Sequence, residues 1–247
     1  MVTTSLDLKI SYHAKMNKFT IIIPIYNEVE SIFNLISEID NEFKKERPEI
    51  IIVNDGSTDR FEEEYKNHNL KYKVVKHKKN LGKCKAMESG IKKATNEIVC
   101  IIDGDGQNPP SQAKKIIKFW HQIPKKNSFS LVCGNRVNRQ DKLIKRISSR
   151  FANKIRMFIL NDECKDTACA LKVFAKSDYL QIPYFKNMHR FLPALFKIKK
   201  GSIYNVPVID RKRVAGISKF NFHNRFWVGI IDLIKVWSLI NIKKGEK

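Results

Sequence analysis

The sequence has no apolar run of about 20 residues, which is the length that a helix needs to cross a bilayer. The stretch from Met1 to Met16 lacks the apolar segment of a secretory signal peptide. The five cysteines are odd in number and form no Cys-x-x-Cys pair, which argues against a disulfide framework and against a zinc site. We therefore expect reduced thiols and a cytoplasmic protein.

Acidic residues are few: 25 Asp and Glu stand against 47 Lys and Arg, which gives a formal charge of +22. This excess favours an anionic partner, and nucleic acid, an anionic membrane surface and a phosphorylated substrate all fit. Compositional drift, with lysine spread over solvated faces, explains the same charge without a partner. Arginine is more telling because it gathers mainly in two groups. They comprise Arg136, Arg139, Arg146, Arg150 and Arg156, and then Arg211 and Arg213.

Strand and helix patterns alternate through the first half of the chain. Short apolar runs predict strands at 19–23, 50–53, 74–75, 98–102 and 130–133. Helical spacing of apolar residues predicts helices at 30–45, 83–94 and 111–121. This order is typical of an α/β fold in which helices flank a mostly parallel central sheet with right-handed crossovers.

The pattern changes after Arg136, although no repeat or low-complexity segment separates the two parts. The expected elements are a basic helix at 143–160, a strand at 171–174, a short helix that opens at 188 and a strand at 203–209. A loop with Asp166 precedes the first of these strands, and a basic loop over 210–219 follows the second.

The most informative stretch, residues 98–110, is an apolar run that stops at two carboxylates. Asp103 and Asp105 end the run, Gln107 follows, and two prolines prevent the strand from continuing. In open α/β sheets, ligands bind beyond the carboxyl ends of the strands. Hard carboxylate oxygens suit Mg²⁺ or Mn²⁺, and Mg²⁺ is often held by one or two carboxylates and substrate phosphates. The stretch therefore predicts a divalent metal with a phosphorylated ligand.

A second acidic turn, residues 54–59, follows the second expected strand. Gly56 permits a tight bend, and Ser57 or Thr58 can cap the helix that follows. Capping does not explain Asp55, which stands where the strand end meets the ligand-binding edge. We therefore expect Asp55 to belong to the site.

Four segments, in this order and spacing, resemble the family 2 glycosyltransferases of GT-A (Rossmann-like) fold. They are Pro24-Ile-Tyr-Asn-Glu28, Asn54-Asp-Gly-Ser-Thr-Asp59, Asn80-Leu-Gly-Lys83 and Asp103-Gly-Asp-Gly-Gln107-Asn-Pro-Pro110. Later segments resemble the dolichol-phosphate mannose synthase branch, which includes the bacterial polyprenyl-phosphate glycosyltransferases. They are Gly134-Asn-Arg136, Asp166 with Leu171-Lys-Val-Phe174, and Val206-Pro-Val followed by Arg213-Val-Ala-Gly216-Ile-Ser-Lys219. The Gln-x-x-Arg-Trp signature of processive polysaccharide synthases is absent.

The resemblance, which runs from about Phe19 to Lys219, implies roles for individual residues. The pocket for the base and ribose of the nucleotide is implied to comprise Pro24, Tyr26, Glu28, Val53 and Asp55. Asp103 and Gly104 are implied to line the nucleotide, with Gly104 standing where relatives usually have an Ala-like residue. The implied metal ligands are Asp103, Asp105 and Gln107. The residues implied to hold donor or acceptor phosphates are Arg136, Arg213 and Lys219. Asp166 is implied to lie near the sugar and the acceptor, so the implied catalytic set is Asp105, Asp166 and Arg136.

The chemistry of such a transfer agrees with these residue types. The leaving group is a diphosphate on which charge builds up, so a divalent cation and fixed cationic side chains favour the transition state. A hydroxyl acceptor needs a general base, whereas a lipid monophosphate carries a charge of about −1.5 to −2 and is itself the nucleophile. With a phosphate acceptor a catalytic base is optional, and cationic positioning becomes the requirement.

The last part of the chain contains an apolar stretch, 226–240, with Trp227 and Trp237. It either packs on the domain or lies in a membrane interface, and we favour the interface. Lys243 and Lys244 would each add about 1 kcal/mol of attraction near anionic lipid. The expected division is a leader at 1–17 that is frayed or an edge strand, a GT-A glycosyltransferase domain at 18–220, and an amphipathic helix with a basic tail at 221–247.

These observations lead to one hypothesis and two rivals. The hypothesis is an inverting transfer, dependent on Mg²⁺ or Mn²⁺, of one sugar from a UDP- or GDP-sugar to a polyprenyl phosphate, by an enzyme peripheral to the cytoplasmic membrane face. The first rival is a soluble family 2 transferase that acts on a sugar or lipid hydroxyl and uses Asp166 as its base. The second is a basic nucleic-acid-binding module. We do not favour it, because the arginines follow the transferase motifs.

Overall fold

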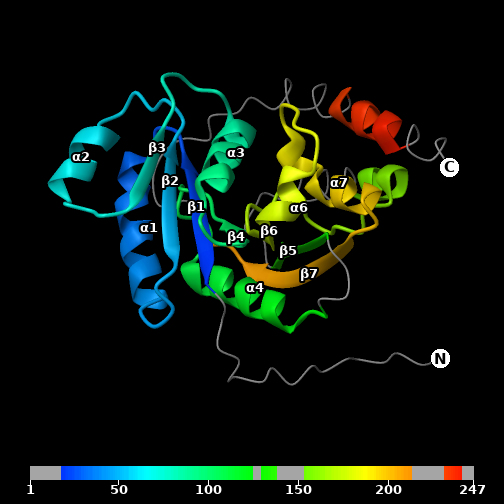
Figure 1. Ribbon diagram of the computed structural model, residues 1–247, viewed down its shortest axis with the longest axis horizontal. Coiled ribbons are helices and arrows are strands. Elements are labelled where there is room, and N and C mark those ends of the chain that lie inside the picture. The colour runs from blue at the N-terminus through cyan, green and yellow to red at the C-terminus, as the bar shows by residue number, and fades with distance from the viewer. Residues whose placement is uncertain (1–17, 125–128, 138–152, 213–230, 241–247) are drawn as a thin grey trace.

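The computed structural model describes residues 18–124, 129–137, 153–212 and 231–240 (Figure 1). Within them, a seven-stranded sheet has the order β3-β2-β1-β4-β6-β5-β7. The strands are β1 (Phe19–Ile25), β2 (Glu49–Asn54), β3 (Lys73–Lys76), β4 (Ile98–Ile101), β5 (Ser130–Val137), β6 (Lys172–Ala175) and β7 (Ser202–Ile209). β6 is antiparallel to β4 and β5, and the other neighbouring pairs are parallel. The prediction of a mostly parallel central sheet is confirmed.

Helices cover both faces of this sheet. They are α1 (Val29–Glu42), α2 (Phe61–Asn67), α3 (Lys83–Lys93), α4 (Pro110–Gln122), α6 (Lys176–Leu180), the 3₁₀ helix η1 (Met188–Arg190) and α7 (Leu192–Ile198). Residues 153–160 and 231–240 are also helical. The helices predicted at 30–45, 83–94 and 111–121 correspond to α1, α3 and α4.

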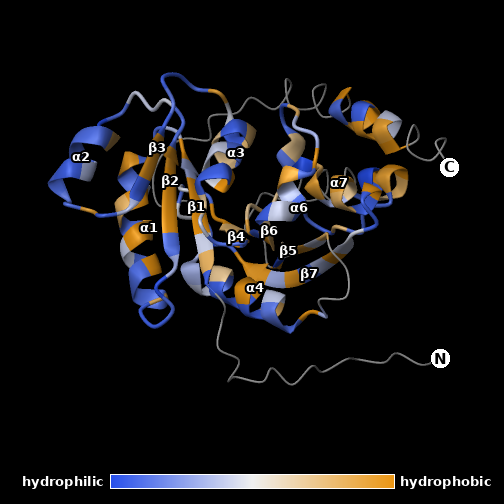
Figure 2. Cartoon of the chain, in the orientation of Figure 1, coloured by the Kyte–Doolittle hydropathy of each residue, from blue (hydrophilic) through white to orange (hydrophobic). Residues whose placement is uncertain are grey.

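Successive residues of a strand pack on opposite faces of the sheet. In β1, Ile21 and Ile23 belong to a core that includes α1 and α4, whereas Ile22 belongs to a core that includes α3 and α7. Because both faces are covered, the central strands are apolar throughout instead of alternating with polar residues. Figure 2 shows these strands and the inward helix faces in hydrophobic colours.

One strand boundary and one capping prediction are wrong. The strand expected at 130–133 continues to Val137, because Gly134 to Val137 pair with Val206 to Ile209 of β7. Neither Ser57 nor Thr58 caps the next helix, which begins at Phe61 with no side-chain cap at the preceding residue. Ser57 Oγ instead accepts a hydrogen bond from the Asn27 N–H (2.9 Å), and the Thr58 N–H donates to Asn27 Oδ1 (2.7 Å). These bonds tie the turn after β2 to the turn after β1.

The stretch at 226–240 is described only from 231. No helix in the described ranges is long and apolar enough to cross a membrane. Val236 is fully buried in the core with α3 and α7, so the helix packs on the domain. Ile231, Ile234 and Trp237 are exposed, so the helix also keeps an apolar face in solvent. The leader, most of the helix expected at 143–160 and the loop after 212 lie outside the described residues.

Candidate active site

The turns that follow β1, β2 and β4 meet at one edge of the sheet. The register pairs Ile25 with Asn54, and the Asp55 N–H donates to the Ile25 carbonyl (2.9 Å). Ser31 Oγ, at the start of α1, donates to the Gly104 carbonyl (2.7 Å). The segments that the sequence singled out are therefore brought together, as parallel strands require.

The acidic turn after β4 contains side chains of different exposure. Asp103 is partly exposed and forms an ion pair with Lys83 (2.5 Å). Asp105 is only 8% exposed, and its Oδ1 accepts a hydrogen bond from the Gln107 N–H (3.1 Å). A Cβ atom on Gly104 would lie 2.5 Å from Cγ2 of Ile25, so the Ala-like residue usual here would force Ile25 to move.

The donor set of this turn fits a divalent cation of the Mg²⁺ or Mn²⁺ class. Asp103 and Asp105 supply carboxylate oxygens, Gln107 supplies an amide oxygen, and the Lys83 ion pair shows that Asp103 attracts positive charge. In the described part of the chain, no cluster of three His, Cys, Asp or Glu residues could hold a metal alone. The turn therefore fits a site that takes further ligands from substrate phosphates, as Mg²⁺ sites often do.

Asp55 is almost completely buried, at 2% exposure. Its carboxylate accepts hydrogen bonds from the N–H groups of Leu81 (2.9 Å) and Gly82 (2.8 Å) and from His77 Nδ1 (2.7 Å). These bonds fix the loop that leads into α3. Asp55 therefore lies at the expected edge, where it shapes the loop from within.

The other residues assigned to the nucleotide pocket differ in how they face the edge. Pro24, Tyr26 and Glu28 are partly exposed. Val53 is fully buried in the core with α3, so its side chain packs inside the protein. The structure therefore does not bring Val53 to the surface that a nucleotide could contact.

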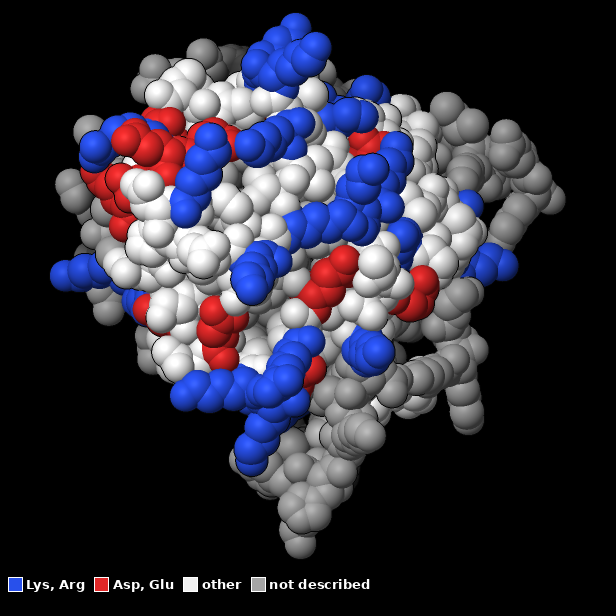
Figure 3. All heavy atoms as spheres, turned by 60° about the vertical axis from the view of Figure 1, so that its left-hand side comes forward, with Lys and Arg blue, Asp and Glu red and all other residues white. Residues whose placement is uncertain are grey.

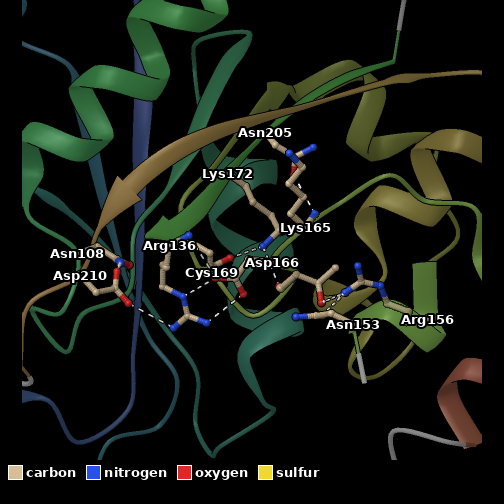
Figure 4. A network of polar contacts seen from close by, with 11 residues as sticks. Asn108, Arg136, Asn153, Arg156, Lys165, Asp166, Cys169, Lys172, Asn205 and Asp210 are labelled. Atoms are coloured by element: carbon tan, nitrogen blue, oxygen red, sulfur yellow. Dashed lines mark hydrogen bonds and ion pairs between the residues drawn. The ribbon is translucent and has the colours of Figure 1, made fainter. Parts of the chain in front are cut away.

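Arg136 of β5 is the centre of a partly buried ionic network (Figure 4). Its Nε and Nη2 donate to the two oxygens of Asp166 (2.6 and 3.0 Å), and its Nη1 lies 3.3 Å from Asp210 Oδ2. Asn108 Nδ2 donates to the other oxygen of Asp210 (2.8 Å). The network links the acidic turn to Asp166 through residues far apart in the sequence.

Burial and charge act in opposite directions within this network. Burial disfavours the charge on Arg136, but the hydrogen bonds and charge of Asp166 outweigh it, so the pKa of Arg136 is raised. Burial raises the pKa of Asp210, and the nearby Arg136 charge offsets only part of that effect. Arg136 is therefore a permanent cation held between two carboxylates.

Two further buried cations hold the loop that carries Asp166. Arg156 donates to Thr167 Oγ1 (2.5 Å) and pairs with Asp162 (2.8 Å). Lys172 Nζ donates to the carbonyls of Thr167 (3.2 Å) and Cys169. The loop is thereby fixed from two sides. The cysteine at its end, like the other four in the chain, is a buried free thiol, and burial raises the pKa of Cys169 to about 12.

Sequence reasoning assigned no role to four residues that the structure places at the site. They are Lys83, Asn108, Asp210 and Arg211. β7 is parallel to β5, and β6 is antiparallel to both β5 and β4, so the carboxyl ends of β7 and β4 lie at the same edge. That topology is the signal that identifies Asp210 and Arg211. Arg213 and Lys219 lie outside the described residues.

Sequence comparison finds relatives over most of the chain. The model of the family described as glycosyl transferase family 2 matches residues 20–182. The dodecaprenyl-phosphate galacturonate synthase of Rhizobium johnstonii is 28% identical over 235 residues, which cover 92% of this chain and 68% of that protein. The undecaprenyl-phosphate 4-deoxy-4-formamido-L-arabinose transferase of Pectobacterium atrosepticum is 28% identical over 209 residues, 82% of this chain and 62% of that protein. The match thus covers about two thirds of the length of these relatives, 68% of the first and 62% of the second.

Solved structures with the same fold have low sequence identity. The mannosyl-3-phosphoglycerate synthase of Rubrobacter xylanophilus has a TM-score of 0.69 at 14% identity, over 89% of this chain and 72% of its own. The glucosyl-3-phosphoglycerate synthase of Mycobacterium tuberculosis, in complex with Mn²⁺, UDP and glucosyl-3-phosphoglycerate, has a TM-score of 0.62 at 16% identity, over 81% and 73%. These likenesses show that the fold is GT-A.

Proposed function

Because this chain belongs to glycosyl transferase family 2, we propose that it moves one sugar from a nucleotide sugar to a polyprenyl phosphate, with inversion at the anomeric carbon. The names of two relatives, a dodecaprenyl-phosphate galacturonate synthase and an undecaprenyl-phosphate formamido-arabinose transferase, support this acceptor class. The donor is a UDP- or GDP-sugar.

The choice of a phosphate acceptor rests on the hydrogen bonds and the burial of Asp166. Both of its oxygens accept hydrogen bonds from the Arg136 guanidinium, and the residue is 3% exposed. A general base must reach the proton of a hydroxyl acceptor, directly or through one water. Asp166 in this arrangement is a partner of Arg136, which suits a phosphate acceptor that needs no base.

The chain's own residues then have distinct tasks. Asp103, Asp105 and Gln107 hold a divalent cation, which when bound offsets the charge that develops on the leaving diphosphate. Arg136, kept charged by Asp166, attracts a phosphate to the same edge of the sheet. Pro24, Tyr26 and Glu28 contact the nucleotide, and Arg213 and Lys219 supply further positive charge.

Lys and Arg side chains are distributed in several groups over the face that includes α2 and β3, with acidic residues between them (Figure 3). A nucleic-acid-binding surface of the usual kind places its cations in one patch or stripe. The charge of +22 suits an anionic partner such as a lipid surface.

We place the enzyme at the cytoplasmic membrane face, as a peripheral protein. Exposed apolar side chains project from the helical segments 153–160 and 231–240, and the most exposed is Phe158 at 90%. Lys154 and Lys235 are exposed on the same two segments and suit an anionic lipid surface.

The membrane placement is tested by sedimentation with anionic vesicles. Phe158→Ser and Ile234→Ser should each weaken binding, because each removes exposed apolar area. Ile209→Ser, which removes a comparably exposed side chain from β7, is the matched control. Equal binding by all three variants would show that these helices do not contact the membrane.

The reaction is tested by transfer of radiolabel from a panel of UDP- and GDP-sugars into organic-extractable product, with Mg²⁺ or Mn²⁺ and undecaprenyl phosphate. An acid-labile, EDTA-sensitive product is expected, and the productive donor names the nucleotide. Transfer to a hydroxyl acceptor without any lipid product would overturn the proposal in favour of a soluble hydroxyl transferase.

A further inference from the structure

The carbonyl groups of the acidic turn are held by donors from other elements. The Gly104 carbonyl accepts from Ser31 Oγ of α1 (2.7 Å). The Gly106 carbonyl accepts from Nε of Arg211 (2.5 Å), and the Gln107 carbonyl accepts from the Arg211 N–H (3.0 Å). One residue therefore holds two successive peptide groups of the turn.

Arg211 is itself fixed in place. Its Nη1 and Nη2 donate to the two oxygens of Glu38 of α1 (3.0 and 2.8 Å). Such a bidentate pair orients the whole guanidinium plane, so the direction of Nε toward the turn is also set. Gly106 has φ +71°. Glycine adopts positive and negative φ about equally readily, so the Gly106 backbone does not by itself fix the turn. Arg211 is therefore the residue that fixes the Gly106 and Gln107 part of the turn.

The residue before Arg211 holds the far side of the same turn. Asp210 accepts a hydrogen bond from Asn108 Nδ2 (2.8 Å), directly after the turn. The end of β7 thus contacts three consecutive residues, Gly106 to Asn108. None of these contacts uses the side chains of Asp103, Asp105 or Gln107 that the proposed function assigns to a cation.

We propose that Arg211 is a positioning residue for the divalent cation site, an inference that rests on the proposed function. By fixing the peptide groups at Gly106 and Gln107, it holds the backbone from which the Asp105 and Gln107 side chains extend. Residues that orient ligands in this way change metal affinity by about 10- to 100-fold when removed.

The test is Mn²⁺ binding, measured by electron paramagnetic resonance with UDP and, separately, with GDP. Arg211→Ala should raise the apparent Kd for Mn²⁺ at least about tenfold. Arg211→Lys should not restore binding, because a single ammonium cannot hold Glu38 and the turn together. Lys115→Ala is the matched control, since Lys115 donates to a β7 carbonyl, that of Pro207 (2.7 Å), away from the turn.

Thermal unfolding of the same variants separates positioning from folding. Arg211 and Glu38 are partly exposed, so Arg211→Ala should leave the unfolding temperature close to that of Lys115→Ala. If Arg211→Ala bound Mn²⁺ with unchanged affinity while Asp105→Ala did not bind it, the positioning role of Arg211 would be overturned. The proposed metal site would still stand. Absence of Mn²⁺ binding in the unmodified protein with either nucleotide would overturn the metal site itself.

Discussion

The sheet edge that carries the candidate site has two halves, one around β1 to β4 and one around β5 to β7, and different kinds of contact hold each half together. Around β1 to β4, polar side chains in the turns accept hydrogen bonds from backbone N–H groups, as in the bonds of Asp55 to Leu81 and Gly82. Around β5, β6 and β7, buried charged side chains provide the links, with Arg136 between Asp166 and Asp210. The first half contains the residues proposed to bind the nucleotide and the cation, and the second contains Arg136, which is proposed to attract a phosphate.

This difference decides which property a substitution changes. Removing one member of a buried ion pair leaves an unpaired charge and costs about 3–5 kcal/mol. Asp103 and Asp105 are proposed to bind a cation, so their removal should affect mainly metal binding and catalysis. We therefore expect substitution of Asp103 or Asp105 in the first half to change activity, and substitution of Asp166 in the second half to change stability.

The largest effect on activity is expected from Asp105→Ala in the first half. Loss of a cation ligand should reduce turnover about 100- to 1,000-fold, while circular dichroism and the unfolding temperature stay close to those of the parent. Turnover is measured by radiolabel transfer at saturating Mn²⁺. Unchanged turnover would remove Asp105 from the metal site.

The largest effect on stability is expected from Asp166→Asn in the second half. Arg136 would keep its charge in a buried site without its bidentate partner, so the free energy of unfolding should fall by about 3 kcal/mol. Urea denaturation measures the change. Glu163→Gln, which breaks the more exposed Lys197 ion pair on the same loop, should cost less than about 1 kcal/mol. Equal costs would contradict the distinction between the halves.

A glycine substitution tests the backbone side of the comparison. Gly56 has φ +69°, and a Cβ there would collide with the Lys79 backbone, so Gly56→Ala should cost about 2 kcal/mol. Gly82 has φ +90° but open space around it, so Gly82→Ala should show only the cost of strain, about 1 kcal/mol. Urea denaturation of both variants separates collision from strain, and equal costs would mean that close packing of the turn contributes nothing.

The smallest effect is expected from Asp210→Asn, and it should appear mainly in the pH dependence of stability. Burial raises the pKa of Asp210 in the folded state above its unfolded value, so folding is favoured at low pH and this contribution is lost as pH rises through the folded pKa. The Asn variant lacks this titration, so its free energy of unfolding should fall less than that of the parent between pH 4 and pH 7. Denaturation curves at the two pH values measure the difference, and an equal or larger fall in the variant would contradict the prediction.

The first half of the fold could be predicted because its signals are local. Apolar runs marked β1, β2 and β4, and the turns after them contain the motif residues themselves, such as Asp103 and Asp105 within one hexapeptide. The topology of parallel strands then places these turns at one edge without further information.

The second half could be predicted only in part. Arg136 and Asp166 were identified separately, but their pairing joins residues 30 positions apart, and the contact to Asp210 spans 74. The extension of β5 to Val137 depends on pairing with β7, which no local pattern indicates. The helix at 231–240 was expected either to pack or to lie in a membrane interface, and one face packs while another stays exposed.

The sequence by itself determined the α/β class, the order of the strands along the chain and the identity of the acidic turns, because periodicity and strand ends are properties of neighbouring residues. Only the tertiary structure decided that Asp55 shapes a loop from inside the protein, that Asp166 is a partner of Arg136, and that Arg211 holds the acidic turn. Those facts depend on which side chains the strand order brings within hydrogen-bonding distance, and distance in space is not a property of any segment alone.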